Sequence, residues 1–206
     1  QHREEPFFAY LSFQAVHAPH HAPEEYIQRY AGTYDEGWDA IRRQRYERMT
    51  TMGVVPRAVD SVVTSDWGTF YDAKTIDWNS LSDEEQAYRA RQMEVYAGMA
   101  EAMDDSIGRV FDYLREQGQL DNTLIIFLSD NGGESTELVN IAPLFYRWRY
   151  SLERDQLGAP GSYSEYGPGW AYASNTPFFS YKGSPFNGGM RVPFLIRHPG
   201  LIPAGT

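Results

Sequence analysis

The sequence predicts an α/β fold, and three features support this assignment. Residues 7–13 and 123–128 are nearly continuous apolar runs, a pattern typical of strands that are covered on both faces of a parallel sheet. A long helix with one apolar stripe is expected between them, and a loop of Asp, Asn and Gly follows the second run at once. Strand, helix and strand form the order of a βαβ unit, whose ligands bind at the carboxyl ends of strands.

The expected long helix begins at a capping box, in which Glu85 follows Ser82 by three residues. In this motif each side chain satisfies a free backbone amide near the other residue. Gly118 is the expected C-terminal stop. Apolar residues that recur at steps of three and four predict one buried stripe, formed by Met93, Tyr96, Ala100, Met103, Ile107, Val110 and Leu114.

Two shorter helices are expected before the long one. A short helix is predicted to begin near Pro23, and a second helix is predicted over residues 38–52, ended by Gly53 and Pro56. This second segment carries a local run of basic residues: Arg42, Arg43, Arg45, Arg48 and Arg57. On an acidic chain we interpret the run as a salt-bridged helix face rather than a nucleic-acid patch.

The last third of the chain predicts less regular structure. Residues 134–176 are rich in Tyr, Trp, Gly and Pro, and we expect a long irregular stretch with one helix near 140–150. Residues 192–196 predict a third short strand. Pro193 places that strand at an edge of the sheet or at a strand start, because proline donates no ladder hydrogen bond.

Length and composition limit the class of protein. The 206 residues suffice for one domain, and the net charge of −10 disfavours general nucleic-acid binding, which depends on Lys and Arg. No apolar run approaches the roughly 20 residues of a membrane helix. The absence of cysteine excludes a thiolate zinc site or a cysteine nucleophile within this span. The chain opens almost inside an apolar run without a signal-peptide pattern, so we expect a piece of a longer protein, of undetermined compartment and oligomeric state.

The loop after the second apolar run is the first candidate for chemistry. Asp130 offers a carboxylate oxygen and Asn131 an amide oxygen, and both suit Ca²⁺ or Mg²⁺. Gly132 and Gly133 let the backbone turn and a ligand approach closely. These residues are also good turn formers, so from the residues alone a plain turn and a metal site both stay open.

Three histidines and one lysine are further candidates. His17, His20 and His21 follow the first apolar run, and histidine binds anions, transfers protons near neutral pH or ligates metals. Their spacing fits no common zinc site, and surface loop histidines are the alternative. Lys182 is followed by glycine and could reach an anion as a mobile charge, or simply be solvated.

The order of these blocks resembles the sulfatase family over nearly the whole chain. The resemblance rests on a histidine–proline loop after a strand, on D-N-T-L-I-I-F-L-S-D-N-G, and on Y-K-G followed by G-G-M-R-V-P. The stretch Y-G-P-x-W-A at residues 166–171 is similar to bacterial arylsulfatases. The resemblance implies an alkaline-phosphatase-like α/β sandwich with a mostly parallel central sheet flanked by helices. Residues 1–206 would form a single domain, part of the catalytic domain.

The resemblance also implies roles for four residues in the hydrolysis of small-molecule sulfate monoesters to an alcohol or phenol plus sulfate. Asp130 and Asn131 would be two of the ligands of Ca²⁺, or of Mg²⁺. Lys182 would hold a sulfate oxygen. His17 would lie near the bridging oxygen as an anion binder or general acid. We choose His17 over the two later histidines because it follows the strand directly, ahead of the first proline.

The nucleophile is where the sequence departs from the family. The family uses a formylglycine made from Cys or Ser in C/S-x-P-x-R, and no such motif occurs here. We expect it upstream, with further metal-binding aspartates, and we expect this chain alone to be inactive. Two alternatives stay open. One is a phosphonate monoester hydrolase or phosphodiesterase of the same superfamily, and the other is a non-catalytic binding paralogue that uses the aromatic stretch 145–172 as a recognition surface.

Overall fold

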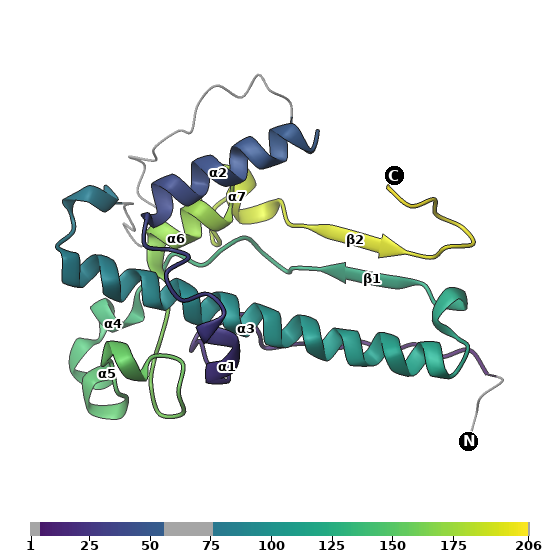
Figure 1. The fold of residues 1–206 in the computed structure, drawn as a ribbon, viewed down its shortest axis with the longest axis horizontal. Helices are drawn as coiled ribbons and strands as arrows, with labels where there is room; N and C mark the ends of the chain where they lie inside the picture. Colours follow the sequence, from purple (N-terminus) through teal and green to yellow (C-terminus); the bar gives the residue numbers. More distant parts are fainter. Residues whose placement is uncertain (1–4, 56–75, 206) are drawn as a thin grey trace.

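The computed structural model describes residues 5–55 and 76–205, and its mixture of helices and strands agrees with the predicted α/β class (Figure 1). The long helix α3 spans the molecule, and α1 packs against it. The elements in chain order are α1 (Glu24–Gln28), α2 (Gly37–Thr51), η1 (Trp78–Ser80), α3 (Asp83–Glu116), η2 (Leu120–Asn122), β1 (Ile125–Leu128), α4 (Leu138–Ile141), α5 (Pro143–Arg149), η3 (Arg154–Gln156), α6 (Gly167–Ser174), α7 (Asn187–Met190) and β2 (Phe194–Arg197). In this described part of the chain, no helix is both long and apolar enough to cross a membrane.

Helix α3 begins and ends where the sequence predicts. The backbone N–H of Glu85 donates to the Ser82 hydroxyl over 3.3 Å, and the backbone N–H of Ser82 donates to the Glu85 carboxylate over 3.0 Å. Gly118 follows the helix with φ +69°, the left-handed conformation that favours glycine at a helix end. The predicted stripe is buried at Met93 and Leu114 and half-buried at its other positions. The predicted stripe is therefore confirmed, and burial is deepest in the first half of the helix, over residues 90–98.

The two shorter helices are also confirmed. Helix α1 follows Pro23 directly, and α2 starts one residue before the predicted 38–52 and ends one residue earlier. Gly53 lies just beyond α2 with φ +74°. Pro56, the other predicted stop, lies outside the described residues.

The salt-bridged face predicted for α2 is wrong for its most buried arginine. The Arg42 side chain is buried, and its guanidinium carbon lies 3.6 Å from the ring centroid of Tyr172. The guanidinium donates to three backbone carbonyls, those of Tyr172, Pro177 and Phe178. Arg45 similarly donates to the Ala173 carbonyl over 3.2 Å. These arginines therefore donate to carbonyls in the last turn of α6, where a helix leaves carbonyls without an internal partner, and in the loop that follows it.

An aromatic core lies between α2, α6 and the start of α3. The rings of Trp38, Trp78 and Trp170 meet edge to face, with centroids 4.8, 5.6 and 5.8 Å apart. Trp170 is fully buried, and its indole N–H donates to the Arg89 carbonyl over 2.8 Å. Edge-to-face aromatic contacts of this kind stabilise beyond the burial of their area. The core therefore anchors α6 and the loop that follows it.

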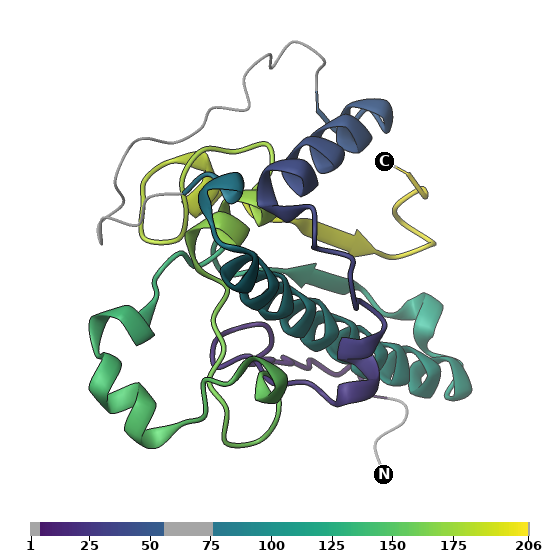
Figure 2. The same ribbon diagram turned by 60° about the vertical axis from the view of Figure 1, so that its left-hand side comes forward.

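Residues 134–176 contain more regular structure than predicted. The helix expected near 140–150 is present as α4 and α5, which lie at one side of the molecule (Figure 2). Helix α6 was not expected, although Pro168 in its first turn is a known start signal. Its residues are buried at nearly every position, so no alternation of polar and apolar faces could reveal it.

The strands β1 and β2 pair antiparallel, from Ile125 opposite Arg197 to Leu128 opposite Phe194. Both predicted strands are confirmed, and β2 begins directly after Pro193. The strand predicted over residues 7–13 is wrong: these residues are irregular and exposed, because a strand needs a neighbour and none of the described residues pairs with them. A mostly parallel central sheet stays a prediction.

Candidate functional site

Two loops meet beyond the carboxyl end of β1. The first loop comprises residues 129–136 after β1, and the second comprises residues 175–190, from the end of α6 to the end of α7. The backbone N–H of Gly132 donates to the Gly189 carbonyl over 3.1 Å, and the backbone N–H of Lys182 donates to the Gly133 carbonyl over 3.0 Å. These bonds bring two segments about 50 residues apart in sequence into one arrangement, which we call the loop pair.

Glycines make this close approach sterically feasible. A Cβ atom on Gly132 would lie 1.7 Å from the Gly188 carbonyl oxygen, and one on Gly188 would lie 1.9 Å from the Ser180 carbonyl oxygen. A Cβ on Gly189 would lie 2.4 Å from the Ser184 carbonyl oxygen. Only residues without a Cβ fit at such distances. Gly132 is therefore required by packing between the loops, and Gly188 and Gly189 by packing within the second loop.

Asn175 joins the two loops from within. Its side-chain oxygen accepts from the Gly133 N–H over 2.8 Å, and its side-chain NH₂ donates to the Ser180 carbonyl over 3.0 Å. Ser180 is buried with φ +70°, a left-handed conformation that costs a non-glycine residue about 1–3 kcal/mol. Asn175 is itself buried, so its hydrogen bond to the Ser180 carbonyl is shielded from water. The amide fixes the backbone that leads into Lys182.

Asp130 and Asn131 lie on the first loop, and their carboxylate and amide oxygens are ligand types that suit a cation. Asp130 is exposed, and Asn131 is half-buried with its NH₂ donating to the Gly132 carbonyl over 2.9 Å. That bond leaves the Asn131 side-chain oxygen as the atom available to a metal ion. Two oxygen donors fit Ca²⁺ chemically but fall short of the six to eight that it prefers. Within residues 5–55 and 76–205, no three His, Asp or Glu side chains gather as a metal site.

Lys182 reaches back to the first loop through its side chain. Its Nζ atom lies 3.5 Å from Oε2 of Glu134, and both side chains are about one third exposed. Burial alone would raise the pKa of the Glu134 carboxyl, but hydrogen bonds from Thr136 and the charge of Lys182 lower it below its ordinary value. Glu134 is therefore an ionised partner of the lysine. Sequence reasoning missed it, because nothing in the sequence shows that residues 134 and 182 meet.

The three histidines divide into one exposed and two inner residues. His17 is exposed, and its Nδ1 lies 2.7 Å from the Ala18 carbonyl oxygen, which can only accept a hydrogen bond. His21 contacts the Ser162 carbonyl through Nε2 over 2.9 Å. Of the three histidines, His17 is therefore the exposed one, and its role at the site stays a prediction.

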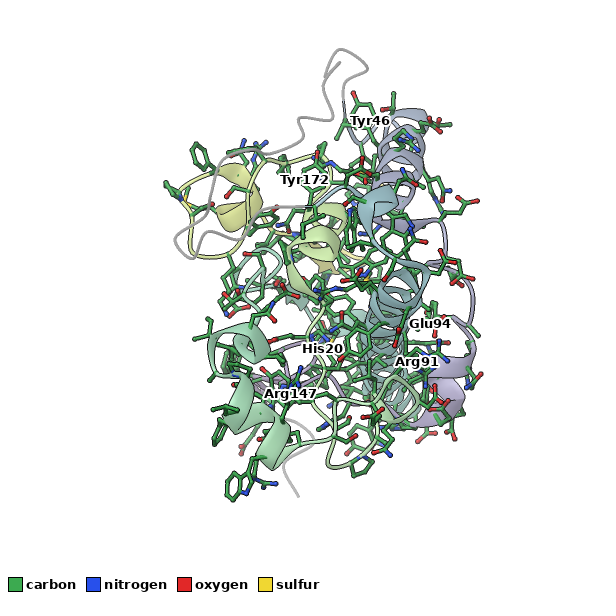
Figure 3. The ribbon with its side chains drawn as sticks, turned by 90° about the vertical axis from the view of Figure 1, so that its left-hand side faces the viewer. His20, Tyr46, Arg91, Glu94, Arg147 and Tyr172 are labelled. Carbon is green, nitrogen blue, oxygen red and sulfur yellow. The ribbon has the colours of Figure 1, made fainter. Side chains whose placement is uncertain are left out.

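His20 is the buried member of the three, and Figure 3 shows it inside the molecule. Its ring stacks on Tyr166 with centroids 5.4 Å apart and meets Tyr96 edge to face at 5.3 Å. Burial, with smaller effects from the charges of His17 and His21, lowers the pKa of His20 to about 3. A neutral, packed imidazole is therefore a structural residue.

The structure brings together three of the four predicted residues. Asp130, Asn131 and Lys182 share the loop pair, whereas His17 lies on a separate segment. That segment connects to the loop pair indirectly, since His20 packs on Tyr166 and a Cβ on Gly133 would lie 2.7 Å from the Tyr166 hydroxyl. Whether His17 faces the same ligand stays a prediction.

A surface hollow of about 370 Å³ lies elsewhere. It is near the end of the β1–β2 pair that is remote from the loop pair. It is lined by Arg115, Gly118, Leu120, Asp121 and Arg197. Arg197 is paired across it with Asp121 over 2.6 Å. None of the candidate residues lines this hollow, so we place the candidate site on the loop pair.

Comparison with known proteins identifies the family. The sulfatase family matches residues 1–206, the whole chain. An uncharacterized sulfatase of Schizosaccharomyces pombe is 42% identical over 205 residues, covering 97% of this chain and 36% of that protein. An arylsulfatase of Klebsiella aerogenes is 34% identical over 206 residues, covering 98% of this chain and 42% of that protein. The chain therefore belongs to the sulfatase family.

A more distant relative lies outside the proteins named as sulfatases. A multifunctional alkaline phosphatase superfamily protein of Trinickia caryophylli is 32% identical over 129 residues, covering 62% of this chain and 23% of that protein. The chain thus spans less than half the length of each of these three relatives.

Proposed function

We propose that this chain is part of the catalytic domain of a sulfuric ester hydrolase of the arylsulfatase type, which converts a sulfate monoester to a phenol or alcohol plus sulfate. The observation that carries the proposal is the loop pair. This chain belongs to the sulfatase family, and its two hydrogen-bonded loops carry the oxygen donors of Asp130 and Asn131 and the ammonium group of Lys182. This combination suits a divalent cation and an anion side by side.

Asp130 and Asn131 would hold the metal ion, Ca²⁺ or Mg²⁺, through a carboxylate oxygen and the free amide oxygen. When bound, such an ion neutralises charge on the anion and polarises its oxygen. Lys182 would bind a sulfate oxygen with the ammonium hydrogens that Glu134 leaves free. An ammonium fixed near the anion stabilises charge that develops as the ester bond breaks.

His17 would act as the general acid for the leaving oxygen. The Ala18 carbonyl accepts at 2.7 Å, so Nδ1 carries a hydrogen and Nε2 is the atom that gains and donates the transferable proton. A positioned acid of this kind contributes about 10²–10⁴-fold to rate. The exposure of His17 agrees with this role, because the imidazole must meet a ligand from outside the chain's own core.

The nucleophile of the proposed reaction is a formylglycine contributed from outside residues 1–206, since the chain holds no C/S-x-P-x-R motif. The chain's own part is to bind, orient and protonate. A second candidate is hydrolysis of a phosphonate monoester or phosphodiester. The relative in Trinickia caryophylli favours keeping it, because that protein is a multifunctional member of the alkaline phosphatase superfamily.

The full-length protein tests the proposal by its turnover of an aryl sulfate, a phosphonate monoester and a phosphodiester. We expect the aryl sulfate to be preferred, and we expect Lys182→Ala and Asp130→Asn each to lower kcat/KM by at least about 10²-fold, the size of loss typical of a removed electrostatic contact. Arg154→Ala is a matched loss of positive charge on an exposed side chain and should leave kcat/KM unchanged. Preference for a phosphorus substrate would favour the second candidate, and full activity of Lys182→Ala would refute both.

A further inference from the structure

Glu134 is the one acidic partner that the described structure gives to Lys182, and this contact is unusual for an anion-binding lysine. The Nζ–Oε2 distance of 3.5 Å is that of a loose ion pair rather than a short hydrogen bond. Both side chains are about one third exposed, so the ammonium also faces solvent. An ammonium carries three donors, and a single loose partner leaves room for an anion beside the carboxylate.

The Glu134 carboxylate is held in place independently of the lysine. Its Oε1 atom accepts from the backbone N–H of Thr136 over 2.8 Å, and Thr136 also binds it through its hydroxyl. The backbone just before Glu134 is also fixed, because Gly133 bonds to both Asn175 and Lys182. The carboxylate therefore keeps an anchor other than the lysine when an anion reaches the ammonium.

We infer that Glu134 is a specificity-determining residue that repels the anion held by Lys182 and so favours release of the inorganic sulfate product over release of the ester substrate. This inference rests on the proposed function. Two groups in contact with one ammonium lie within about 7 Å of each other, which is less than the Debye length of about 8 Å at physiological salt. Solvent ions therefore screen their repulsion only in part.

The charges of substrate and product differ, and this difference gives the selectivity. A sulfate monoester carries one negative charge, whereas inorganic sulfate at neutral pH carries two. Coulomb repulsion is proportional to the ligand's charge, so its energy is twice as large for the dianion as for the monoanion. The factor by which Glu134 weakens binding of the dianion is therefore the square of the factor for the monoanion. For two charges about 7 Å apart in the dielectric of bulk water, which suits part-exposed groups, we expect about threefold for the ester and about tenfold for sulfate.

The test uses Glu134→Gln in the full-length protein at constant ionic strength. We expect the inhibition constant Ki of inorganic sulfate to fall about tenfold and KM of an aryl sulfate to fall about threefold. Glu134→Asp keeps the charge and should leave Ki within about twofold of wild type. Glu137→Gln is the matched control, because Glu137 lies on the same segment but pairs with Arg89. It should leave both constants unchanged.

Sulfate binding, measured as protection against thermal unfolding, gives a readout that does not depend on turnover. If Ki and the dissociation constant of sulfate are unchanged or higher in Glu134→Gln, the inference is wrong. A higher Ki would mean that the carboxylate positions the lysine. Equal effects of Glu134→Gln and Glu134→Asp would also overturn it, because charge would then not be the cause. Lys182→Ala distinguishes failure of the proposed function from failure of this inference. If it leaves sulfate binding intact, the proposed role of Lys182 fails. If it weakens sulfate binding but Glu134→Gln has no effect, only the inference is refuted.

Discussion

Gly132 faces Gly188 so closely that a Cβ atom on Gly132 would lie 1.7 Å from the carbonyl oxygen of Gly188. The atom in conflict is backbone, so a side chain cannot turn aside to relieve the contact. We predict that Gly132→Ala separates the two loops, costs about 1–3 kcal/mol of unfolding free energy and lowers kcat/KM by about 10²-fold, since small displacements of binding groups are costly. Chemical denaturation and steady-state kinetics on the full-length protein measure the two effects.

Gly108→Ala is the control for this change. Gly108 lies within α3, and a Cβ there would meet nothing within 4 Å. Alanine favours helix over glycine, so this variant should gain about 0.5–1 kcal/mol and keep its activity. Wild-type activity in Gly132→Ala would show that the loop pair is not the site.

His20 predicts a pH dependence of stability. Its pKa in the folded protein is about 3, against an ordinary value of 6.5, so between these values the unfolded chain binds a proton that the folded chain does not. Its contribution is fully present above pH 6.5 and is lost as pH falls toward 3. We compare the unfolding free energy of His20→Phe with that of the wild-type protein. Between pH 7.5 and pH 5 this difference should shift by about 2 kcal/mol in favour of the variant. Parallel stability curves for the two proteins would contradict this assignment, since all other titrating groups are shared.

The sequence predicts well what local chemistry decides. The capping box at Ser82 and the glycine at Gly118 fix α3 by hydrogen bonds and backbone conformation within a few residues, and both were found as expected. The strands on either side of the loop pair were also placed within two residues of their predicted bounds. The failed strand over residues 7–13 has the same apolar pattern as β1, but pairing depends on a neighbour that composition does not reveal.

The candidate site was predictable in its residue types but not in its contacts. Asp130 and Lys182 were proposed from the sequence because their motifs resemble those of the sulfatase family, and their roles stay predictions. Glu134 and Asn175 were missed, because their roles depend on contacts between the two loops. Gly-Gly in both loops was the available signal, since paired glycines far apart in sequence indicate close backbone approach.

The contacts of Arg42 require a guanidinium group rather than a positive charge alone. Its side chain is buried, lies over the Tyr172 ring and donates to three carbonyls. A lysine has no planar fork and cannot reproduce these contacts, so we expect Arg42→Lys to lose about 2–3 kcal/mol of unfolding free energy. Arg43→Lys, one residue along at an exposed position, should change stability by less than about 0.5 kcal/mol. Equal stability of the two variants would show that the carbonyls are satisfied in another way.

Residues 1–206 taken alone should bind Ca²⁺ weakly. Asp130 and Asn131 supply two oxygen donors, and the described residues form no cluster of three His, Asp or Glu side chains. We expect a dissociation constant no tighter than about 10⁻³ M by calorimetry, the weak end of protein calcium sites. Asp130→Asn should abolish what binding remains. Micromolar affinity in the isolated chain would require a ligand set other than the one proposed.

His17 can be tested through the leaving group of the substrate. A phenol with a low pKa leaves readily as its anion, whereas an alkyl alcohol needs a proton, so a general acid matters more for the alkyl ester. We predict that His17→Ala in the full-length protein lowers kcat by about 10²–10⁴-fold on an alkyl sulfate and by much less on a nitrophenyl sulfate. An anion-binding role would weaken both substrates alike, because the sulfate group is the same. Equal losses on the two esters, measured over the same pH range, would therefore assign His17 to binding and leave the acid to be found elsewhere.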